Sequence, residues 1–397
     1  MILLHNLKNL RVGISSLYCS IASITKSVVV ENLKSSHFTL PNQILCRNFT
    51  SEISENQHNF TVNYLVNSCG LSLGNAISAS KLLNLQTPEK ADSVLALLRS
   101  HGFSQHQISK FVRSCPKTLL SCPEKTLLPK LEFFASVGVS REDLARTVAT
   151  NPCLLTVSLE KRIVPTYNFL RSLLSEKNVI GVFKRRSWIF LVDHCKDVVP
   201  NIGLLRELGM PQPSISLLLA HYTHVTMNKH KRFGKIVGEV KEMGFSLQTS
   251  TFVFALHTLC GKSSKLIWKR SCKIFMSWGW SEDDFLSAFR KNPEFTIVSE
   301  KKLVQVMDFL VNKMGWPSGM IARYPRVMRH SLEKRIRPRC LVVKVLRLKG
   351  LIDENLSLDY VMQPQERLFL ERFVTKFQIE VPQLWNVYQG KVGIEDV

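Results

Sequence analysis

A repeat of about 35 residues governs which folds are open to this chain. Aligning the sequence on itself gives eight equivalent positions, called landmarks here, with gaps of 36, 36, 35, 35, 35, 36 and 32 residues. The landmarks are Ser80, Pro116, Pro152, Ser187, Tyr222, His257, Pro293 and Pro325. A fixed period of this length is typical of small supersecondary units that stack on one another.

Proline and glycine at fixed offsets predict a first helix in each unit. Four units carry a second proline 13 residues after the landmark, at Pro129, Pro165, Pro200 and Pro338. Proline suits the first turn of a helix, where its missing N–H has no intrahelical role, so these prolines should start helices. A glycine lies 22 residues after six landmarks, at Gly102, Gly138, Gly209, Gly244, Gly279 and Gly315. Glycine adopts the left-handed C-cap without strain, so the first helix should end there.

A second helix should begin just after each glycine and end at the next landmark. Ser104 precedes Gln107 by three residues, and Ser140 with Asp143 and Ser281 with Asp284 repeat this spacing. This is the capping-box arrangement. The landmark proline should stop the second helix, because the residue before a proline is driven out of helical geometry.

Units this small cannot bury their apolar faces alone, so they must stack. We therefore predict an all-α fold, a right- or left-handed superhelical α-solenoid of about eight repeats with a long concave surface. The expected organisation is an organellar transit peptide over 1–50, a lead-in helix over 51–79, the repeat solenoid over 80–350, and a C-terminal helical cap and tail over 351–397.

The first 51 residues have the composition of an organellar leader, with five basic residues, one acid and many Ser and Thr. Leucines at three- and four-residue spacings around Lys8 and Arg11 can form a basic amphipathic helix. A secretory signal is the rival, because residues 12–25 are uncharged, but five Ser or Thr interrupt that stretch. We expect mitochondrial localisation, with the chloroplast as the alternative.

The ten cysteines form no C-x-x-C pair and no Cys/His quartet at zinc spacing, so we interpret them as reduced thiols, mostly in the core. Cys115 and Cys122 are the closest two in sequence, and a disulfide or metal role for them alone is a minor alternative. No uncharged stretch is free of interruptions, so no membrane span is expected.

No combination of residues predicts an enzyme. Residues 261–263 read Gly-Lys-Ser, like the end of a phosphate loop, but the earlier glycine is replaced by Leu256. His221, His224 and His230 lack a nearby Cys, Asp or Glu as a further metal ligand, which favours surface or phosphate-contacting histidines. We expect no catalytic residue, no metal and no cofactor.

The charge is strongly positive, at +22, and it is densest from Arg323 to Lys349, where ten bases face only Glu333. Clustered bases can neutralise phosphates and release their counterions, although charge runs are also ordinary solvated faces. The candidate nucleic-acid-binding residues are Lys184, Arg185, Arg186, Lys229, Lys231, Arg232, Lys269, Arg270, Arg290, Lys291, Arg323, Arg326, Arg329, Arg335, Arg337 and Arg339.

Six aromatic residues have two interpretations. They could stack on exposed bases, as in single-strand and RNA recognition, but such residues more often belong to the core. They are Trp188, Tyr222, Trp268, Trp278, Trp280 and Trp316.

Five segments give the sequence a resemblance to the plant branch of the mitochondrial transcription termination factor (mTERF) family. They are FTVNYL (60–65), SCPEKTLLPKLEF (121–133), NIGLLRELG (201–209), AFRKNP (288–293) and SLEKRI (331–336), within a similarity that covers roughly 60–390. The resemblance implies a superhelical stack that binds organellar nucleic acid without catalysis. The chain departs from the family's repeat where the landmark proline is missing, at Ser187, Tyr222 and His257.

The leading hypothesis is a monomeric organellar protein that binds DNA or RNA in transcription termination, other transcription control, or splicing and RNA maturation. Its protein partners would be organellar transcription or splicing proteins. The rival is a solenoid scaffold that binds proteins through its groove. Salt distinguishes the two, because phosphate binding weakens steeply as salt rises. The choice between DNA and RNA stays open.

Overall fold

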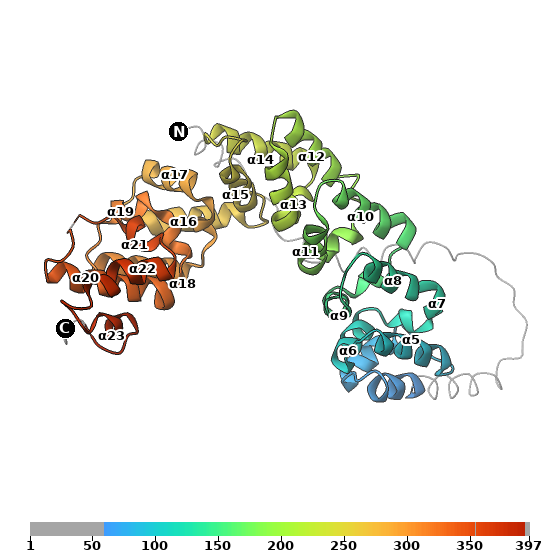
Figure 1. Ribbon diagram of the computed structural model, residues 1–397. Coiled ribbons are helices and arrows are strands. Elements are labelled where there is room, and N and C mark those ends of the chain that lie inside the picture. The colour runs from blue at the N-terminus through green and yellow to red at the C-terminus, as the bar shows by residue number, and fades with distance from the viewer. Residues whose placement is uncertain (1–58, 354, 394–397) are drawn as a thin grey trace, which may run out of the picture. The chain divides into compact units, whose positions relative to one another are not determined.

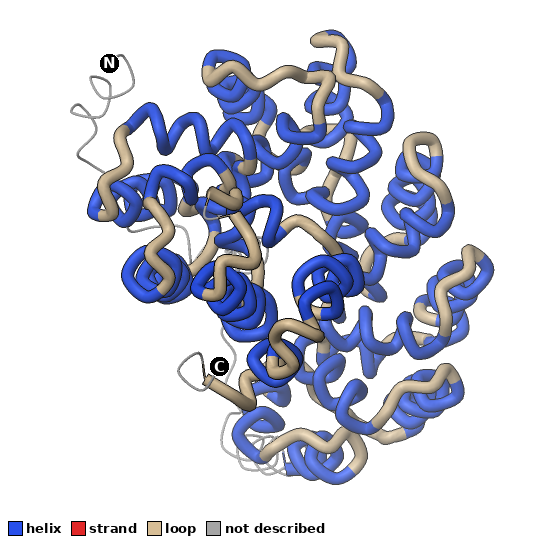
Figure 2. Tube along the Cα trace, turned by 60° about the vertical axis from the view of Figure 1, so that its left-hand side comes forward, coloured by secondary structure: helices blue, strands red, loops and turns tan. Residues whose placement is uncertain are grey.

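The computed structural model describes residues 59–353 and 355–393. The predicted transit peptide lies outside the described residues, as do the ends of the lead-in and tail segments. Within the described part, regular structure is entirely helical, and Figure 2 shows helices joined by short loops with no strand. The predicted all-α fold is confirmed.

Each unit supplies a first helix and a second helix. The first helices are residues 59–67, α5 (Glu89–Ser100), α8 (Leu128–Ser136), α10 (Val164–Arg171), α12 (Val198–Glu207), α14 (His230–Glu242), α16 (Ser264–Ser277), α18 (Glu300–Asp308) and α20 (Arg337–Leu348). The second helices are α4 (Leu73–Ser80), α6 (Gln105–Ser114), α9 (Arg141–Thr150), α11 (Glu176–Arg186), α13 (Gln212–Thr226), α15 (Ser250–Leu259), α17 (Glu282–Lys291) and α19 (Ser318–Arg323).

Short helices connect these pairs. Five 3-10 helices stand at landmarks: η1 (Pro116–Leu120), η2 (Pro152–Leu155), η4 (Ser187–Leu191), η5 (Pro293–Ile297) and η7 (Pro325–Arg329). One further α-turn, α7 (Pro123–Thr126), and three π-turns complete the repeats: η3 (Leu159–Ile163), η6 (Phe309–Lys313) and η8 (Leu332–Ile336). The C-terminal segment contains α21 (Leu358–Met362), α22 (Glu366–Phe373), η9 (Thr375–Phe377) and α23 (Leu384–Tyr388).

Neighbouring units stack through equivalent elements, in chain order, as the colours of Figure 1 show. The second helices α6 and α9 pack together, as do α11 and α13, and α17 and α19. The landmark helices also meet, η2 against η4 and η5 against η7. Buried apolar side chains run without interruption from one unit to the next, which is how units too small to fold alone share a core.

The predicted glycine turns are confirmed. All six glycines have positive φ, between 71° at Gly315 and 88° at Gly138. The chain then closes a Schellman turn, in which the Phe103 N–H donates to the Leu98 carbonyl at 3.1 Å. Gly70 and Gly350, outside the predicted series, end the helix over 59–67 and α20 in the same left-handed conformation.

The serine caps are confirmed at two sites and incomplete at a third. Ser104 with Gln107 and Ser281 with Asp284 form both bonds of the capping box. Ser140 accepts from the Asp143 N–H at 3.2 Å, and the Asp143 carboxylate accepts instead from the Ser140 hydroxyl and from Lys184. The second helix therefore starts where predicted in all three units.

The landmark breaks are confirmed wherever proline is present. Each landmark proline opens a 3-10 helix, and the residues before them, Cys115, Asn151, Asn292 and Tyr324, have ψ between 59° and 85°. Ser187 opens η4 in the same way after Arg186, whose ψ is 40°. A landmark proline moves ψ of the preceding residue further from the helical region, because its ring clashes with that residue. The break at Ser187 shows that a helix can end at a landmark without proline.

Two landmarks differ from the prediction. In α13 the non-helical residue is Tyr222 itself, with φ −127° and ψ 35°, so Thr223 stands where other units have proline. At His257 no break occurs, and α15 continues to Leu259. Neither position carries a proline, so α15 can continue through His257, while α13 has its kink at Tyr222 without one.

All four first-helix prolines lie near helix starts. Two of them, Pro165 and Pro338, come after a helical turn that has already begun. Pro165 and Pro338 are second residues of α10 and α20, and each follows a π-turn that begins six residues earlier, at Leu159 and Leu332. A proline ring clashes with the carbonyl four residues back, and the wider π-turn relieves that contact. The helical path therefore begins about a turn and a half before the proline.

Candidate nucleic-acid interface

The sixteen predicted basic residues differ in what their side chains contact. One is buried, ten are bonded within the protein, and five are exposed without an internal side-chain bond in the described part of the chain. These five are Arg186, Lys231, Lys269, Arg323 and Arg326.

Arg339 is a structural residue, so its prediction as a phosphate contact is wrong. Its side chain is 1% exposed, and the guanidinium donates to the carbonyls of Val361, Met362 and Pro364 at 3.0, 3.3 and 2.9 Å. The same group lies over the Phe369 ring at 4.5 Å. No surface remains on Arg339 for an external anion.

Arg339 belongs to a periodic series of buried donors 14 residues after a landmark. Each donates to a carbonyl 25 residues further along the chain. The bonds are Lys130 to Leu155 at 2.6 Å, Asn201 to Thr226 at 2.9 Å, Ser271 to Thr296 at 2.7 Å and Arg339 to Pro364 at 2.9 Å. The position therefore satisfies carbonyls between stacked units.

Arg335 also holds the C-terminal segment, whereas Arg337 contacts Glu333 and the Phe309 ring. Arg335 donates to the Met362 and Pro364 carbonyls at 2.7 and 2.9 Å. Arg337 binds both oxygens of Glu333, at 2.9 and 3.1 Å, and lies over the Phe309 ring at 4.8 Å. Within the basic run from Arg323 to Lys349, Arg335, Arg337 and Arg339 therefore bond to other parts of the protein.

Four other predicted arginines bond to backbone carbonyls of neighbouring units. Such carbonyls at helix ends lack intrahelical partners, and the multiple donors of arginine suit them. The bonds are Arg185 to Ala220 at 2.9 Å, Arg232 to Cys260 and Gly261 at 3.3 and 3.2 Å, Arg270 to Val298 at 2.9 Å and Arg290 to Met243 at 2.7 Å.

Four predicted bases remain partly open although they are engaged. Lys184 pairs with Asp143 at 2.8 Å, Lys229 with Asp197 at 3.1 Å, and Arg329 with Glu294. Lys291 donates to the Arg323 carbonyl at 3.5 Å. The exposed lysine contacts are weak and can exchange partners with an incoming phosphate, whereas Arg329 pairs with a Glu294 side chain that is buried.

Sequence reasoning named Lys231 but missed that its position in the repeat is basic in most units. A lysine lies nine residues after six landmarks and eight after His257, in or just before the first turn of each unit's first helical segment. We call these residues the lysine row: Lys125, Lys161, Lys196, Lys231, Lys265, Lys302 and Lys334. All are exposed except Lys302, which donates to the Arg329 carbonyl at 3.1 Å. Searching the sequence for basic residues at a fixed offset from the landmarks would have found this row.

The lysine row stands where helix stability favours the opposite charge. The hydroxyls of Ser158 and Ser331 accept from the N–H groups of Lys161 and Lys334, so these lysines occupy the capping-box position usual for Glu or Gln. A cation near a helix N-terminus opposes the macrodipole. Glutamates immediately before these lysines supply the favourable charge instead. Helix stability therefore does not account for the lysines.

A polar cluster joins the middle landmarks. The Tyr222 hydroxyl donates to Glu294 at 2.9 Å, and Glu294 pairs with Arg329. His224 and His257 are 3.2 Å apart between ring nitrogens, and burial lowers the pKa of each to about 4, with nearby Arg186 adding to the effect. His224 is only partly exposed, because α15 packs against α13 beside it.

The aromatic residues belong mainly to the core. Trp280 and Trp316 are 4% and 3% exposed. Trp268 packs edge-on against Phe285 and Phe289 at 5.0 and 4.8 Å. Trp188, 38% exposed, is the most open of the predicted tryptophans.

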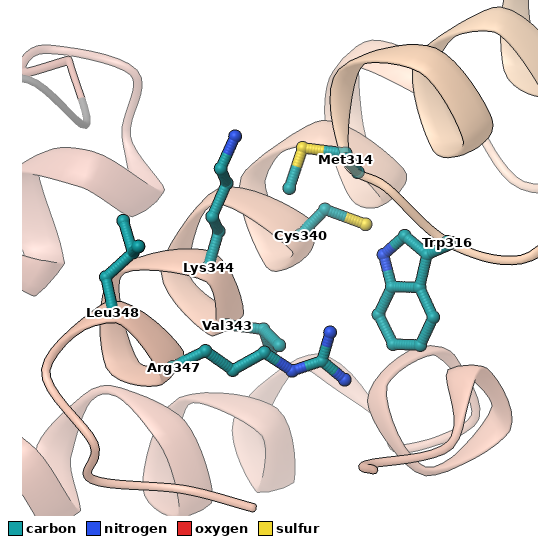
Figure 3. A pocket seen from close by; sticks show the side chains of 7 residues that line it. All are labelled: Met314, Trp316, Cys340, Val343, Lys344, Arg347 and Leu348. Carbon is teal, nitrogen blue, oxygen red and sulfur yellow. The ribbon is translucent and has the colours of Figure 1, made fainter. Parts of the chain in front are cut away.

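A cavity of about 450 Å³ lies beside α20 (Figure 3). Its lining includes the Trp316 ring, with the Arg347 guanidinium 4.5 Å above it, and Lys344, which donates to the Lys313 carbonyl at 3.3 Å. Both cations are engaged within the protein, and the lining contains no acid to pair with them.

The described residues offer neither a metal site nor a membrane span. Among them, no group of three His, Cys, Asp or Glu side chains is close enough to hold a metal ion. None of the helices described combines the length and apolar character needed to span a bilayer.

The sequence matches the model of the mTERF family over residues 95–260 and 253–370. The chain belongs to the mTERF family. The matched residues run from within α5 to within α22 and include the whole lysine row and every predicted basic residue. The family resemblance is thereby confirmed, and four of the five segments lie within the matched residues.

Three curated mTERF proteins of Arabidopsis thaliana are similar to this chain, each at 22% identity. They are the mitochondrial transcription termination factor MTERF15 and the chloroplastic factor MTERF8, matched over 73% and 72% of this chain, and the mitochondrial factor MTEF18, over 72%. The match covers 56% of each relative, so this chain spans about half the length of the proteins it resembles.

Proposed function

We propose that this mTERF protein binds organellar DNA or RNA and acts in transcription termination, in other transcription control, or in splicing and RNA maturation. The observation that carries the proposal is the lysine row, an exposed cation repeated at one position of successive units. The relatives named as transcription termination factors of mitochondria and chloroplasts support the organellar setting.

The spacing of the row suits a phosphate backbone. Packed helices lie roughly 8–10 Å apart, so equivalent lysines of neighbouring units recur at intervals that a polyanion can bridge. Lysine is a flexible point charge and needs no fixed phosphate geometry. Such contacts give affinity without reading sequence. Arg323 and Arg326, exposed at the end of α19 and in η7, are two further guanidinium groups that can donate to phosphates.

The test replaces four exposed lysines of the row, Lys161, Lys196, Lys231 and Lys334, with glutamine. Binding to labelled duplex and single-stranded probes is titrated at several salt concentrations. Each phosphate contact contributes roughly 0.9 to the salt slope for duplex DNA and 0.7 for single strands, so the slope should flatten by about three units.

The matched control replaces four exposed lysines outside the row, Lys90, Lys110, Lys177 and Lys241, with glutamine. Both variants lose the same charge, so a general field effect weakens both alike. Equal weakening contradicts the lysine row as the binding surface. If affinity for nucleic acid is undetectable or independent of salt in the parent chain, the protein-scaffold function is favoured instead.

A further inference from the structure

Two cysteines of consecutive units meet at the landmarks. Cys115 immediately precedes Pro116, and Cys153 immediately follows Pro152. Their sulfur atoms are 3.9 Å apart although the residues are 38 apart in sequence. The cysteine that is nearest to Cys115 in sequence, Cys122, donates instead to Glu124 at 3.2 Å. Stacking therefore pairs Cys115 with Cys153, not with Cys122.

The two thiols differ in access. Cys153 is exposed, whereas Cys115 is partly covered, and burial, together with the neighbouring thiol, raises the pKa of Cys115 to about 12. Both lie at a break in helical structure, Cys115 as the C-cap of α6 and Cys153 within η2. A disulfide needs the sulfurs to approach from 3.9 Å to about 2 Å, which rotation of side chains at such breaks can supply.

We propose that Cys115 and Cys153 form a reversible disulfide between two units when the protein meets a peroxide. The exposed Cys153 sulfur, as thiolate, attacks one peroxide oxygen, the O–O bond breaks, and a sulfenic acid and water result. Cys115 then loses its proton and attacks the Cys153 sulfur, so that the S–S bond forms and a second water leaves. The two sulfurs give up two electrons in total, and the peroxide takes them.

The bond would add a covalent link between the landmark edges of two units that already meet through packing and through the hydrogen bond from Lys130 to the Leu155 carbonyl. It closes a loop of 38 residues and so restricts the unfolded chain. A thiol reductant reverses the step by exchange, which returns both cysteines to the free form.

The experiment exposes the reduced, folded full chain to hydrogen peroxide, blocks remaining thiols and maps tryptic peptides without reduction. Trypsin places Cys115 in 114–117, Cys153 in 147–161 and Cys122 in 118–125, so the three thiols are resolved. A linked 114–117/147–161 peptide is expected, lost after treatment with dithiothreitol. The oxidised chain should also unfold a few degrees higher.

Three variants serve as controls. Cys115→Ser and Cys153→Ser should each abolish the linked peptide and the thermal shift, whereas Cys122→Ser should retain both. A dominant link to Cys122, or a link that forms only in denaturant-unfolded protein, overturns the proposal. So does recovery of both cysteines as reduced thiols, or as sulfinic acids, after peroxide treatment. Circular dichroism before oxidation checks that each variant is folded.

Discussion

Arginine and lysine do different work in this protein. Arg335 and Arg339 reach carbonyls of the C-terminal segment, and Arg290 reaches one at the end of α14. A planar group with several donors can satisfy more than one helix-end carbonyl at once, whereas a strongly hydrated ammonium is best left in water. A sequence count of basic residues does not separate arginines that bond within the protein from lysines that stay in solvent.

Replacing Arg339 with methionine should therefore reduce stability. The change leaves the buried Val361 carbonyl without its donor, and leaves the Met362 and Pro364 carbonyls with Arg335 alone, at a cost of about 2 kcal/mol. Lys334→Met, five residues away and exposed, should stay within about 0.5 kcal/mol of the parent. Urea unfolding measures both. Equal stability of the two variants would mean that the Arg339 bonds contribute nothing net.

Three histidines should make stability depend on pH. Burial lowers the pKa of His224, His257 and His330 to about 4 in the folded chain, against roughly 6.5 when unfolded. Between these values the unfolded chain binds more protons, so stability rises with pH, is fully present above about 6.5, and falls toward pH 4.

The urea midpoint should consequently decrease from pH 7 to pH 5, by an amount equivalent to about 1 kcal/mol for each histidine once solvent screening is allowed for. His257→Asn should reduce this dependence, and the exposed His106→Asn should not. A pH profile that His257→Asn leaves unchanged would place the proton uptake elsewhere.

At the level of elements, glycine is unfavourable inside a helix but favourable at a helix end that needs positive φ. In α12 and its cap, Gly203 is helical, whereas Gly209 has φ +82°. A Cβ added at either position would meet no atom within 4 Å. Only backbone conformation therefore separates the two sites.

Alanine should stabilise the protein at Gly203 and destabilise it at Gly209, by about 0.5–1 kcal/mol and about 1 kcal/mol respectively. Thermal unfolding of the two variants measures the difference. The same sign of change at both positions would contradict the assignment of Gly209 as the left-handed cap.

A landmark proline is not required to end a second helix where neighbouring units stack. η4 forms after Arg186 without a landmark proline, while α15 continues through His257. The Ser187 hydroxyl accepts from the Asn151 amide of the previous unit at 3.2 Å, so a contact between units accompanies the break there. Tertiary contact and local propensity together decide each helix end.

For the whole molecule, the leader is the feature that should determine location. A fluorescent reporter fused to residues 1–61 should enter mitochondria, because the first 51 of these residues have five bases and one acid and can form an amphipathic helix. Imaging against mitochondrial and plastid markers measures the outcome. Fluorescence confined to plastids would favour the chloroplast alternative, and cytosolic fluorescence would contradict the leader itself.

The sequence by itself determined the repeat, the glycine turns and the helical class, because each depends on the conformational limits of one or two residues. Tertiary structure decided which charges reach solvent. Arg326 and Arg339 lie in the same basic run, yet one is exposed and the other is buried against carbonyls of a segment 22 to 25 residues away. The pairing of Cys115 with Cys153 also needed the stack. Burial is set by which units pack together, and no local pattern of charge or cysteine spacing encodes it.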